Sequence, residues 1–257
     1  MNANELKGKT AIVTGGARGI GRAIVTALAV AGANVVIADV READAQATAT
    51  EIRKAVGTQV LSVGADVTKL ENMERVREAV IRDFGAIDIL VNNAGWDRLM
   101  PFLKTTPDLW DRVIGINYRG VLNTCYAVLP HMVSRKQGAI INISSDSARV
   151  GSLGEAVYSG AKAAVIAFSK TIAREHARDN IRVNVICPGL VDTPLLHEIQ
   201  NEEFGQKVLG SIVNYIPLKR FAKPEDIAPM VAFLASDAAS YITGQVTSIN
   251  GGLTMAG

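Results

Sequence analysis

Tyr158 and Lys162 are the two residues whose types and spacing most clearly suit chemistry. They stand four positions apart at the start of a predicted helix, so both side chains lie on one helix face. A free tyrosine titrates near about pH 10, and an ammonium group beside it favours the phenolate and lowers its pKa. We therefore expect Tyr158 to act as a general acid or base with Lys162 beside it. The same spacing also occurs on ordinary solvated helix faces.

Two further polar residues could serve this pair. Ser145 follows a predicted strand that ends at Ser144, and a hydroxyl there could hold a substrate oxygen and stabilise developing charge. Asn117 lies within a largely apolar helical stretch, residues 110–128, and is either part of the site or an amide satisfied by its helix neighbours.

A glycine-rich loop joins the first predicted strand to the first predicted helix. Gly15, Gly19 and Gly21 give the spacing G-x3-G-x-G directly after the strand. Such a loop makes a tight turn, lets a pyrophosphate approach the backbone, and aims a helix N-terminus at anionic oxygens. The strand–loop–helix context predicts a dinucleotide site.

Asp39 closes the second predicted strand and bears on the choice of dinucleotide. A carboxylate there can accept the hydroxyls of the adenosine ribose and would repel a 2′-phosphate, which favours NAD. Arg18 opposes this preference, since a guanidinium in the loop could pair with the 2′-phosphate of NADP. Two unit charges about 4 Å apart interact by about 4 kcal/mol at an intermediate dielectric constant, so we expect the carboxylate to dominate. NAD is the expected cofactor, with NADP possible.

Small and polar residues follow the next two predicted strands. Asp66 and Val67 stand where an open α/β sheet binds an adenine ring, and residues 92–95 (Asn-Asn-Ala-Gly) suit the ligand crevice. Both segments would also make ordinary turns.

The elements that must position these residues alternate between strands and helices. The predicted helices include residues 18–31, 41–56, 70–84 and 158–178. Several strands are almost continuously apolar, as strands buried on both faces are; we predict them at residues 10–14, 34–39, 60–64, 87–92, 138–144, 182–187 and 246–249. This order predicts an α/β fold, a single Rossmann-type doubly wound parallel sheet with helices on both faces, in one domain spanning residues 1–257.

Composition excludes several other classes. The chain is 48% hydrophobic and 20% charged with a net charge of +2, and its basic residues form no block, so we expect no nucleic-acid partner. The uncharged run at residues 23–38 is broken by Gly32 and Asn34 and is too short for a membrane span. Cys125 and Cys187 lie in apolar runs and are expected to be reduced thiols of a cytoplasmic protein. The N-terminus lacks a signal peptide's apolar region, and we expect no metal.

The ordered motifs make the chain resemble the short-chain dehydrogenase/reductase family over its whole length. They are TGGARGIG (14–21), Asp66-Val67, NNAG (92–95), Asn117, Ser145, YSGAK (158–162) and Pro188-Gly189. The resemblance implies an NAD(P)-dependent oxidoreductase that interconverts a secondary alcohol and a ketone, and a homotetramer.

The same resemblance implies the roles of individual residues. Ser145 would orient the substrate oxygen, and Tyr158 would exchange the proton. Lys162 would lower the pKa of Tyr158 and hold the nicotinamide ribose, Asn117 would support a proton-relaying water, and Thr193 would bind the carboxamide. The expected cofactor contacts are Gly15, Arg18, Gly19, Ile20, Gly21, Asp39, Asp66, Val67, Asn93, Ala94, Gly95, Tyr158, Lys162, Pro188, Gly189, Val191 and Thr193.

Loops at the carboxyl ends of the strands should choose the substrate. We expect the stretch at about residues 190–217 to contribute, with Trp96 and Leu195 as apolar walls and Arg98 and Arg149 as anion contacts unless they are simply solvated. Runs such as NNAGWDRLMPF and SDSARVGSLGEAVYSGAKA resemble 2-hydroxycyclohexane-1-carbonyl-CoA dehydrogenases, which implies oxidation of a β-hydroxyacyl-CoA thioester with NAD. The alternatives are an NADPH-dependent 3-oxoacyl-carrier-protein reductase and a non-catalytic dinucleotide-binding sensor or scaffold, which the complete Asn-Ser-Tyr-Lys set disfavours.

Overall fold

A parallel sheet of seven strands organises the part of the chain that the computed structural model describes, residues 5–209 and 212–256. The strands run in the order β3-β2-β1-β4-β5-β6-β7. Their bounds are β1 Thr10–Thr14, β2 Asn34–Asp39, β3 Val60–Gly64, β4 Ile89–Asn92, β5 Gly138–Ile143, β6 Ile181–Pro188 and β7 Val246–Ile249. The predicted α/β fold with a doubly wound parallel sheet is therefore confirmed.

Alternate residues of each central strand enter two separate cores, which explains why the strands are apolar throughout. In β1, Ala11 and Val13 belong to the core on one face of the sheet, while Ile12 belongs to the core on the other. Val36 and Ile37 of β2 divide in the same way.

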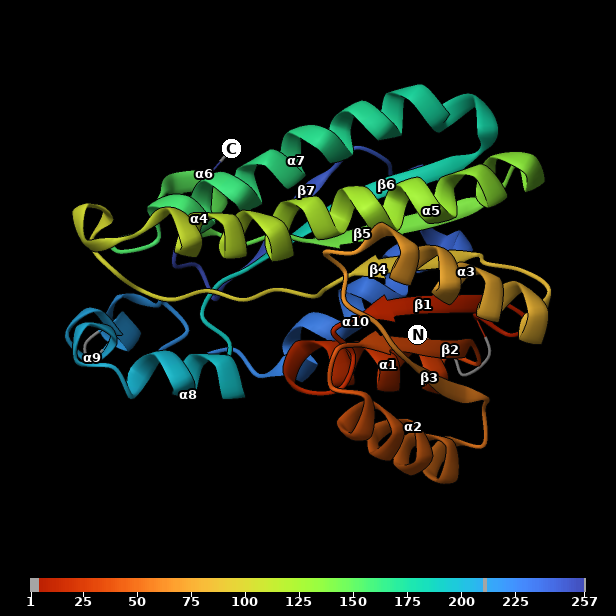
Figure 1. Ribbon diagram of the computed structural model, residues 1–257, viewed down its shortest axis with the longest axis horizontal. Helices are drawn as coiled ribbons and strands as arrows, with labels where there is room; N and C mark the ends of the chain where they lie inside the picture. The colour runs from red at the N-terminus through yellow and green to blue at the C-terminus, as the bar shows by residue number, and fades with distance from the viewer. Residues whose placement is uncertain (1–4, 210–211, 257) are drawn as a thin grey trace.

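Helices cover both faces of the sheet (Figure 1). One face packs against α1 (Gly19–Val30), α2 (Glu42–Val56) and α10 (Pro224–Ala235). The other packs against α3 (Leu70–Phe84), α5 (Gly120–Arg135) and α7 (Ala156–His176). The chain begins on β1, builds outward to β3, and returns to β4 on the other side of β1. The two halves of the sheet therefore diverge between β1 and β4, and the carboxyl ends of these strands leave a crevice there.

The helical stretch predicted at residues 110–128 is interrupted in the structure. It consists of α4 (Pro107–Ile114), a π-helical turn at Gly115–Arg119 (η2) and α5. The stretch is helical throughout, as predicted; the π turn within it was not predicted, because a π turn keeps a helical hydropathy pattern and differs in its hydrogen bonding. Such turns are frequent at functional sites, and Asn117 lies inside this one.

Short helices stand beyond the carboxyl ends of the strands. They are α6 (Ser147–Val150), α8 (Pro194–Gln200) and α9 (Glu203–Leu209), with 3-10 turns at Phe102–Lys104 and Ile212–Tyr215. Two further 3-10 turns, Ala177–Asp179 and Asp237–Ala239, precede β6 and β7. In Figure 1, α8 and α9 project to the side of the sheet where β1 points. Residues 210 and 211 of the predicted 190–217 stretch, and residues 1–4 and 257 of the predicted domain, lie outside the described residues.

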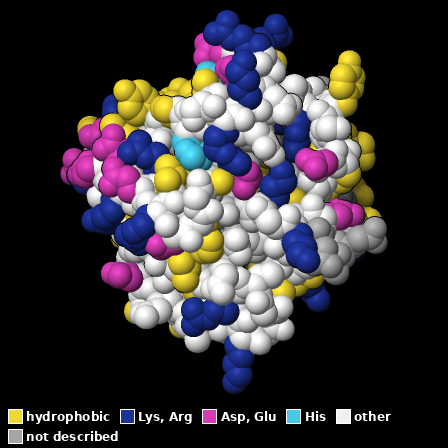
Figure 2. Space-filling model, turned by 90° about the vertical axis from the view of Figure 1, so that its right-hand side faces the viewer, with side chains coloured by type: hydrophobic (Ala, Val, Ile, Leu, Met, Phe, Trp, Pro, Cys, Tyr) yellow, Lys and Arg dark blue, Asp and Glu magenta, His cyan; other side chains and the backbone are white. Residues whose placement is uncertain are grey.

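Charge and cysteine chemistry agree with the expectations from composition. Basic and acidic side chains are intermixed on the face seen in Figure 2, so this face carries no patch of a single sign. Cys125 and Cys187 are buried free thiols. None of the helices described is long and apolar enough to cross a membrane.

Candidate functional site

A cavity of about 970 Å³ opens at the carboxyl ends of the strands and gathers nearly all the predicted site residues. Asn117 and the two expected anion contacts, Arg98 and Arg149, do not line it. Those that do are Gly15, Arg18, Gly19, Ile20, Gly21, Asp39, Asp66, Val67, Asn93, Ala94, Gly95, Trp96, Ser145, Tyr158, Lys162, Pro188, Gly189, Val191, Thr193 and Leu195.

The glycine loop at one end of the cavity admits no side chains at two positions. A Cβ at Gly21 would stand 2.0 Å from the carbonyl oxygen of Gly15. Gly15 has φ of 64°, and a Cβ there would stand 2.8 Å from Cα of Ala94. The loop is held from below by Asn93, whose Nδ2 donates to the carbonyls of Thr14 and Gly15 at 3.1 and 2.9 Å.

The loop leads directly into the N-terminus of α1. Arg18 is the N-cap residue and its side chain makes no capping hydrogen bond, so the first N–H groups of α1 face the cavity without a side-chain acceptor. A bare helix N-terminus above close-packed glycine backbone fits the diphosphate of a dinucleotide in both charge and shape.

Asp39 is buried beside this loop, and its carboxylate already accepts two backbone hydrogen bonds. Oδ2 accepts from the N–H of Ala17 at 3.0 Å, and Oδ1 accepts from the N–H of Arg41 at 2.9 Å. Each oxygen retains a second lone pair for a ribose hydroxyl. Arg18 is turned away from Asp39 into an ion pair with Glu198 of α8, at 2.8 Å. Arg41, which the sequence analysis did not single out, also lines the cavity.

Tyr158 and Lys162 lie on one face of α7, as predicted, with Nζ of Lys162 5.7 Å from the centre of the Tyr158 ring. Lys162 is 2% exposed, and its ammonium donates to the carbonyl of Ile143 at 2.9 Å. Burial lowers the pKa of Lys162 to about 8. Burial also raises the pKa of Tyr158, reinforced by the nearby carboxyls of Glu155 and Asp97. In the protein alone, burial thus outweighs the expected lowering of the Tyr158 pKa by Lys162.

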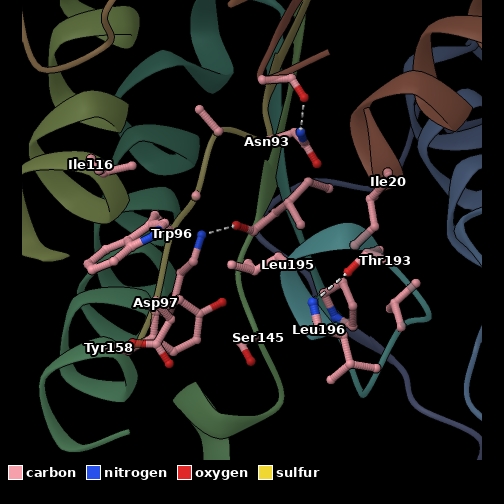
Figure 3. Close-up of a pocket in the computed structure, with 18 of the residues that line it drawn as sticks. Ile20, Asn93, Trp96, Asp97, Ile116, Ser145, Tyr158, Thr193, Leu195 and Leu196 are labelled. Carbon is pink, nitrogen blue, oxygen red and sulfur yellow. Dashed lines mark hydrogen bonds between the residues drawn. The ribbon is translucent and has the colours of Figure 1, made fainter. Parts of the chain in front are cut away.

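Ser145 meets Tyr158 from the end of β5. A hydrogen bond from Ser145 to the phenol favours the ionised form and so opposes the effect of burial on the pKa of Tyr158. Ser147 supports it, with Oγ at 2.9 Å from Oγ of Ser145. Ser144, one residue earlier, points the opposite way and donates to the carbonyl of Lys162 at 2.8 Å, which fixes α7 to the end of β5. Figure 3 shows Ser145 and Tyr158 facing the same space.

Asn117 lies beneath the cavity wall, fully buried in the π turn. Its Nδ2 donates to the carbonyls of Trp96 and Val113 at 2.6 and 2.9 Å, and its Oδ1 accepts from the N–H of Trp96 at 3.3 Å. A Cβ on Gly95 would stand 3.1 Å from Asn117 Oδ1 and 3.4 Å from Lys162 Nζ. Asn117 therefore fixes the Gly95–Trp96 segment against Lys162, and its expected support of a relay water stays a prediction.

The predicted substrate contacts divide into two groups. Trp96 and Leu195 line the cavity, with the guanidinium of Arg112 3.8 Å above the Trp96 ring. Arg149 lies outside the cavity lining: its guanidinium donates to Ser248 at 3.0 Å and to the carbonyl of Ala256 in the C-terminal segment, so its contact with a substrate anion stays a prediction. Arg98 is paired with Glu202.

Thr193 lines the cavity and also begins α8. Its Oγ1 accepts from the N–H of Leu196 at 3.2 Å, as Figure 3 shows. This capping bond leaves the hydroxyl proton for another acceptor, so the expected contact with a carboxamide stays a prediction.

Four carboxyl groups that line the cavity were not predicted from the sequence: Asp97, Asp111, Asp146 and Glu155. Asp146 accepts hydrogen bonds from Ser248, Asn250 and Thr254 and so ties the C-terminal segment beside Ser145. Asp97 and Glu155 line the cavity near Tyr158. Asp97 follows the 92–95 motif closely and Glu155 precedes Tyr158 by one helical turn, so proximity to the motifs was the available signal.

No group of metal-ligating side chains is found within residues 5–209 and 212–256.

Comparison with known proteins identifies the family. A family model described as enoyl-(acyl carrier protein) reductase matches residues 15–254. The chain belongs to the short-chain dehydrogenase/reductase family. This short-chain dehydrogenase/reductase is an NAD(P)-dependent oxidoreductase that interconverts alcohols and ketones, as the sequence predicted.

Relatives of this short-chain dehydrogenase/reductase share a common description. It is 38% identical to a 3-oxoacyl-[acyl-carrier-protein] reductase of Thermotoga maritima over 97% of this chain and 99% of that one. It is 40% identical to the reductase of the same description from Chlamydia trachomatis, over 96% and 98%. A solved 3-ketoacyl-(acyl-carrier-protein) reductase from Brucella melitensis, complexed with NADH, matches with a TM-score of 0.88 and 33% identity, covering 97% of this chain and all of that one (100%).

Proposed function

We propose that this enzyme reduces 3-oxoacyl thioesters, carried on acyl carrier protein or coenzyme A, to 3-hydroxyacyl thioesters with NADH. The observation that carries the reaction type is the convergence of Ser145, Tyr158 and Lys162 at one cavity beside the glycine loop. The substrate class comes from the relatives, which are described as 3-oxoacyl-carrier-protein reductases. They favour the reductase alternative over the expected 2-hydroxycyclohexane-1-carbonyl-CoA dehydrogenase.

The protonation of the site suits the reductive direction. When bound, the reduced nicotinamide supplies a hydride to the ketone carbon. Ser145 holds the ketone oxygen by a hydrogen bond, and Tyr158 transfers its phenolic proton to that oxygen as negative charge develops there. The raised pKa of Tyr158 keeps the phenol protonated and ready to donate. Lys162, fixed by the carbonyl of Ile143, lies beside the ring and stabilises the phenolate that remains.

The preference for NADH over NADPH rests on Asp39. A 2′-phosphate at the end of β2 would approach a buried carboxylate, which is electrostatically unfavourable. Arg18, which could have neutralised the phosphate, is paired with Glu198. Arg41 is the remaining cation of the cavity near Asp39.

A steady-state assay tests the proposal with two thioesters that differ in the bond reduced. Acetoacetyl-CoA offers a 3-oxo group, and crotonyl-CoA offers a carbon–carbon double bond in the same acyl chain. We expect oxidation of NADH, followed by its absorbance, with acetoacetyl-CoA and not with crotonyl-CoA. Turnover of crotonyl-CoA alone would overturn the proposed substrate class in favour of the reaction that the family model's description names.

A further inference from the structure

Asp97 carries a buried carboxyl oxygen with no partner inside the proposed substrate cavity. The residue is 7% exposed, and Oδ2 makes no hydrogen bond. It follows Trp96 on the loop after β4, and Figure 3 shows it beside Tyr158 on the wall of the cavity. A buried polar atom without a partner is costly in a folded protein, so this oxygen, which faces the cavity, calls for a hydrogen-bond partner there.

A second carboxyl group stands close to Asp97. Glu155, at the N-terminus of α7, lines the same cavity; burial raises its pKa, and a hydrogen bond from the hydroxyl of Ser152 opposes this rise. Within the described residues, Asp97 receives one hydrogen bond, from the backbone N–H of Arg98. When two buried carboxyls lie close together, the better solvated one ionises and the other keeps its proton. Glu155 is less buried than Asp97, and the pKa of Asp97 is the one raised to about 8, so the charge is assigned to Glu155 and the proton to Asp97.

We propose that Asp97 acts as a neutral carboxylic acid that donates a hydrogen bond from Oδ2 to the thioester carbonyl oxygen of the substrate. That oxygen is two carbons from the ketone held by Ser145 and Tyr158, so a 3-oxoacyl thioester presents both acceptors to one wall of the cavity. Glu155 is a positioning residue, because its charge keeps the proton on Asp97. The inference rests on the proposed function for the identity of the second oxygen.

The electrostatics of Asp97 agree with this assignment. Burial, followed by the charge of Glu155, raises its pKa to about 8, while the N–H of Arg98 and the ammonium of Lys162 act in the opposite direction. The carboxyl is therefore protonated below about pH 8, and the donor is lost as the pH rises above that value. Tyr158 and Lys162 are the other titratable groups that interact with it.

The test compares acetoacetyl-CoA with cyclohexanone, a ketone that has no second oxygen. The measured quantity is the ratio of kcat/KM for the two substrates, because titration of Tyr158 or Lys162 affects both and cancels. In the wild-type enzyme we expect this ratio to fall as the pH is raised through about 8. Asp97→Val should lower the ratio about 10- to 100-fold at neutral pH, the range expected for one lost buried hydrogen bond.

Asp97→Asn is the rescue variant, since its amide donates a hydrogen bond at every pH. We expect its ratio to stay within about threefold of the wild-type value at neutral pH and to lose its dependence on pH. Glu155→Gln should move the fall in the wild-type ratio to lower pH, because removal of the negative charge lowers the pKa of Asp97. A merely structural role for either residue would not move this curve.

The outcomes separate the inference from the proposed function. A wild-type enzyme that reduces cyclohexanone but not acetoacetyl-CoA would refute the proposed function and the inference with it. If acetoacetyl-CoA is a substrate, a pH-independent ratio in the wild type overturns the inference alone. An equal loss in Asp97→Asn and Asp97→Val also overturns it, since that pattern requires a carboxylate acceptor, as for a cationic substrate.

Discussion

Burial sets the chemistry of the individual residues at this site. Lys162 and Tyr158 are both surrounded by protein, and desolvation disfavours the charged form of each. The neutral phenol is the form that donates a proton to a ketone, whereas alcohol oxidation needs the phenolate. The sequence predicts that Tyr158 can act as an acid or a base, and its buried surroundings favour the protonated form, which acts as the acid.

Replacing Tyr158 removes the proton donor and little else. We expect Tyr158→Phe to lower kcat by about 10²- to 10⁴-fold, the usual contribution of general acid catalysis. Binding of NADH, followed by its fluorescence, should be retained within about threefold because the ring remains. Substantial turnover by the variant would remove Tyr158 from its proposed role.

Asp39 governs the choice between the two dinucleotides. Asp39→Ala should improve kcat/KM for NADPH relative to NADH by about tenfold or more, since loss of one unit-charge repulsion exceeds about 1.4 kcal/mol. Arg41, next to the vacated position, is expected to supply the attraction. The double variant Asp39→Ala/Arg41→Ala should lose most of the gain, and an unchanged cofactor ratio in Asp39→Ala would contradict the assignment.

Two elements of the site, the β1–α1 loop and the π turn at Gly115–Arg119, act through close contacts between atoms and not through regular secondary structure. The loop between β1 and α1 keeps its shape because its backbone packs directly against other backbone atoms. The π turn places Asn117 so that its amide donates to the carbonyl of Trp96. Neither feature depends on the hydrophobic pattern that identifies strands and helices.

Adding a single methyl group at a glycine tests whether close backbone packing is needed for dinucleotide binding. Gly21→Ala would place Cβ 2.0 Å from the carbonyl oxygen of Gly15, so the loop must shift and binding of NADH should weaken by about tenfold or more. Gly160→Ala on α7 is the matched control, because a Cβ there meets nothing within 4 Å. The control should bind NADH normally and gain up to about 1 kcal/mol in stability from helix propensity. Isothermal calorimetry and urea unfolding measure the two effects, and normal NADH binding by Gly21→Ala would contradict the close-packed loop.

The sequence predicted those elements whose formation is determined by one local property, either hydrophobic burial or backbone sterics. Buried strands and the glycine loop followed from hydropathy and backbone sterics. Three features that were not predicted depend on partners distant in sequence. They are the π turn at Asn117, the ion pair that holds Arg18 away from Asp39, and the contacts of Arg149 with the C-terminal segment. Asp97 and Glu155 were missed for the same reason, because a carboxyl is ordinary until the fold buries it beside another.

At the scale of the whole molecule, the layer of helices formed by α4, α5 and α7 carries exposed apolar side chains. Ile114 of α4 and Tyr126 of α5 are 43% and 70% exposed on the face that turns away from the sheet. We propose the homotetramer that the family resemblance implies, with the layer that carries Ile114 and Tyr126 as one of its interfaces.

Light scattering tests the assembly directly. We expect four times the mass of one chain for the wild type. Tyr126→Arg should give a smaller assembly, because an unpaired charge in an interface is strongly unfavourable. Val30→Arg, at the end of α1 on the opposite layer, is the matched control and should keep the wild-type mass. A wild-type monomer would refute the proposed interface.

The anchoring of the C-terminal segment by Asp146 also affects when the cavity is completed during folding. The cavity takes residues from Gly15 to Thr254, and β7 joins the sheet only through β6. A nascent chain on the ribosome therefore holds the glycine loop long before the contacts of Ser248, Asn250 and Thr254 exist. Because folding is slow when pairing partners are far apart in sequence, recovery of activity on refolding should lag behind recovery of helical circular dichroism.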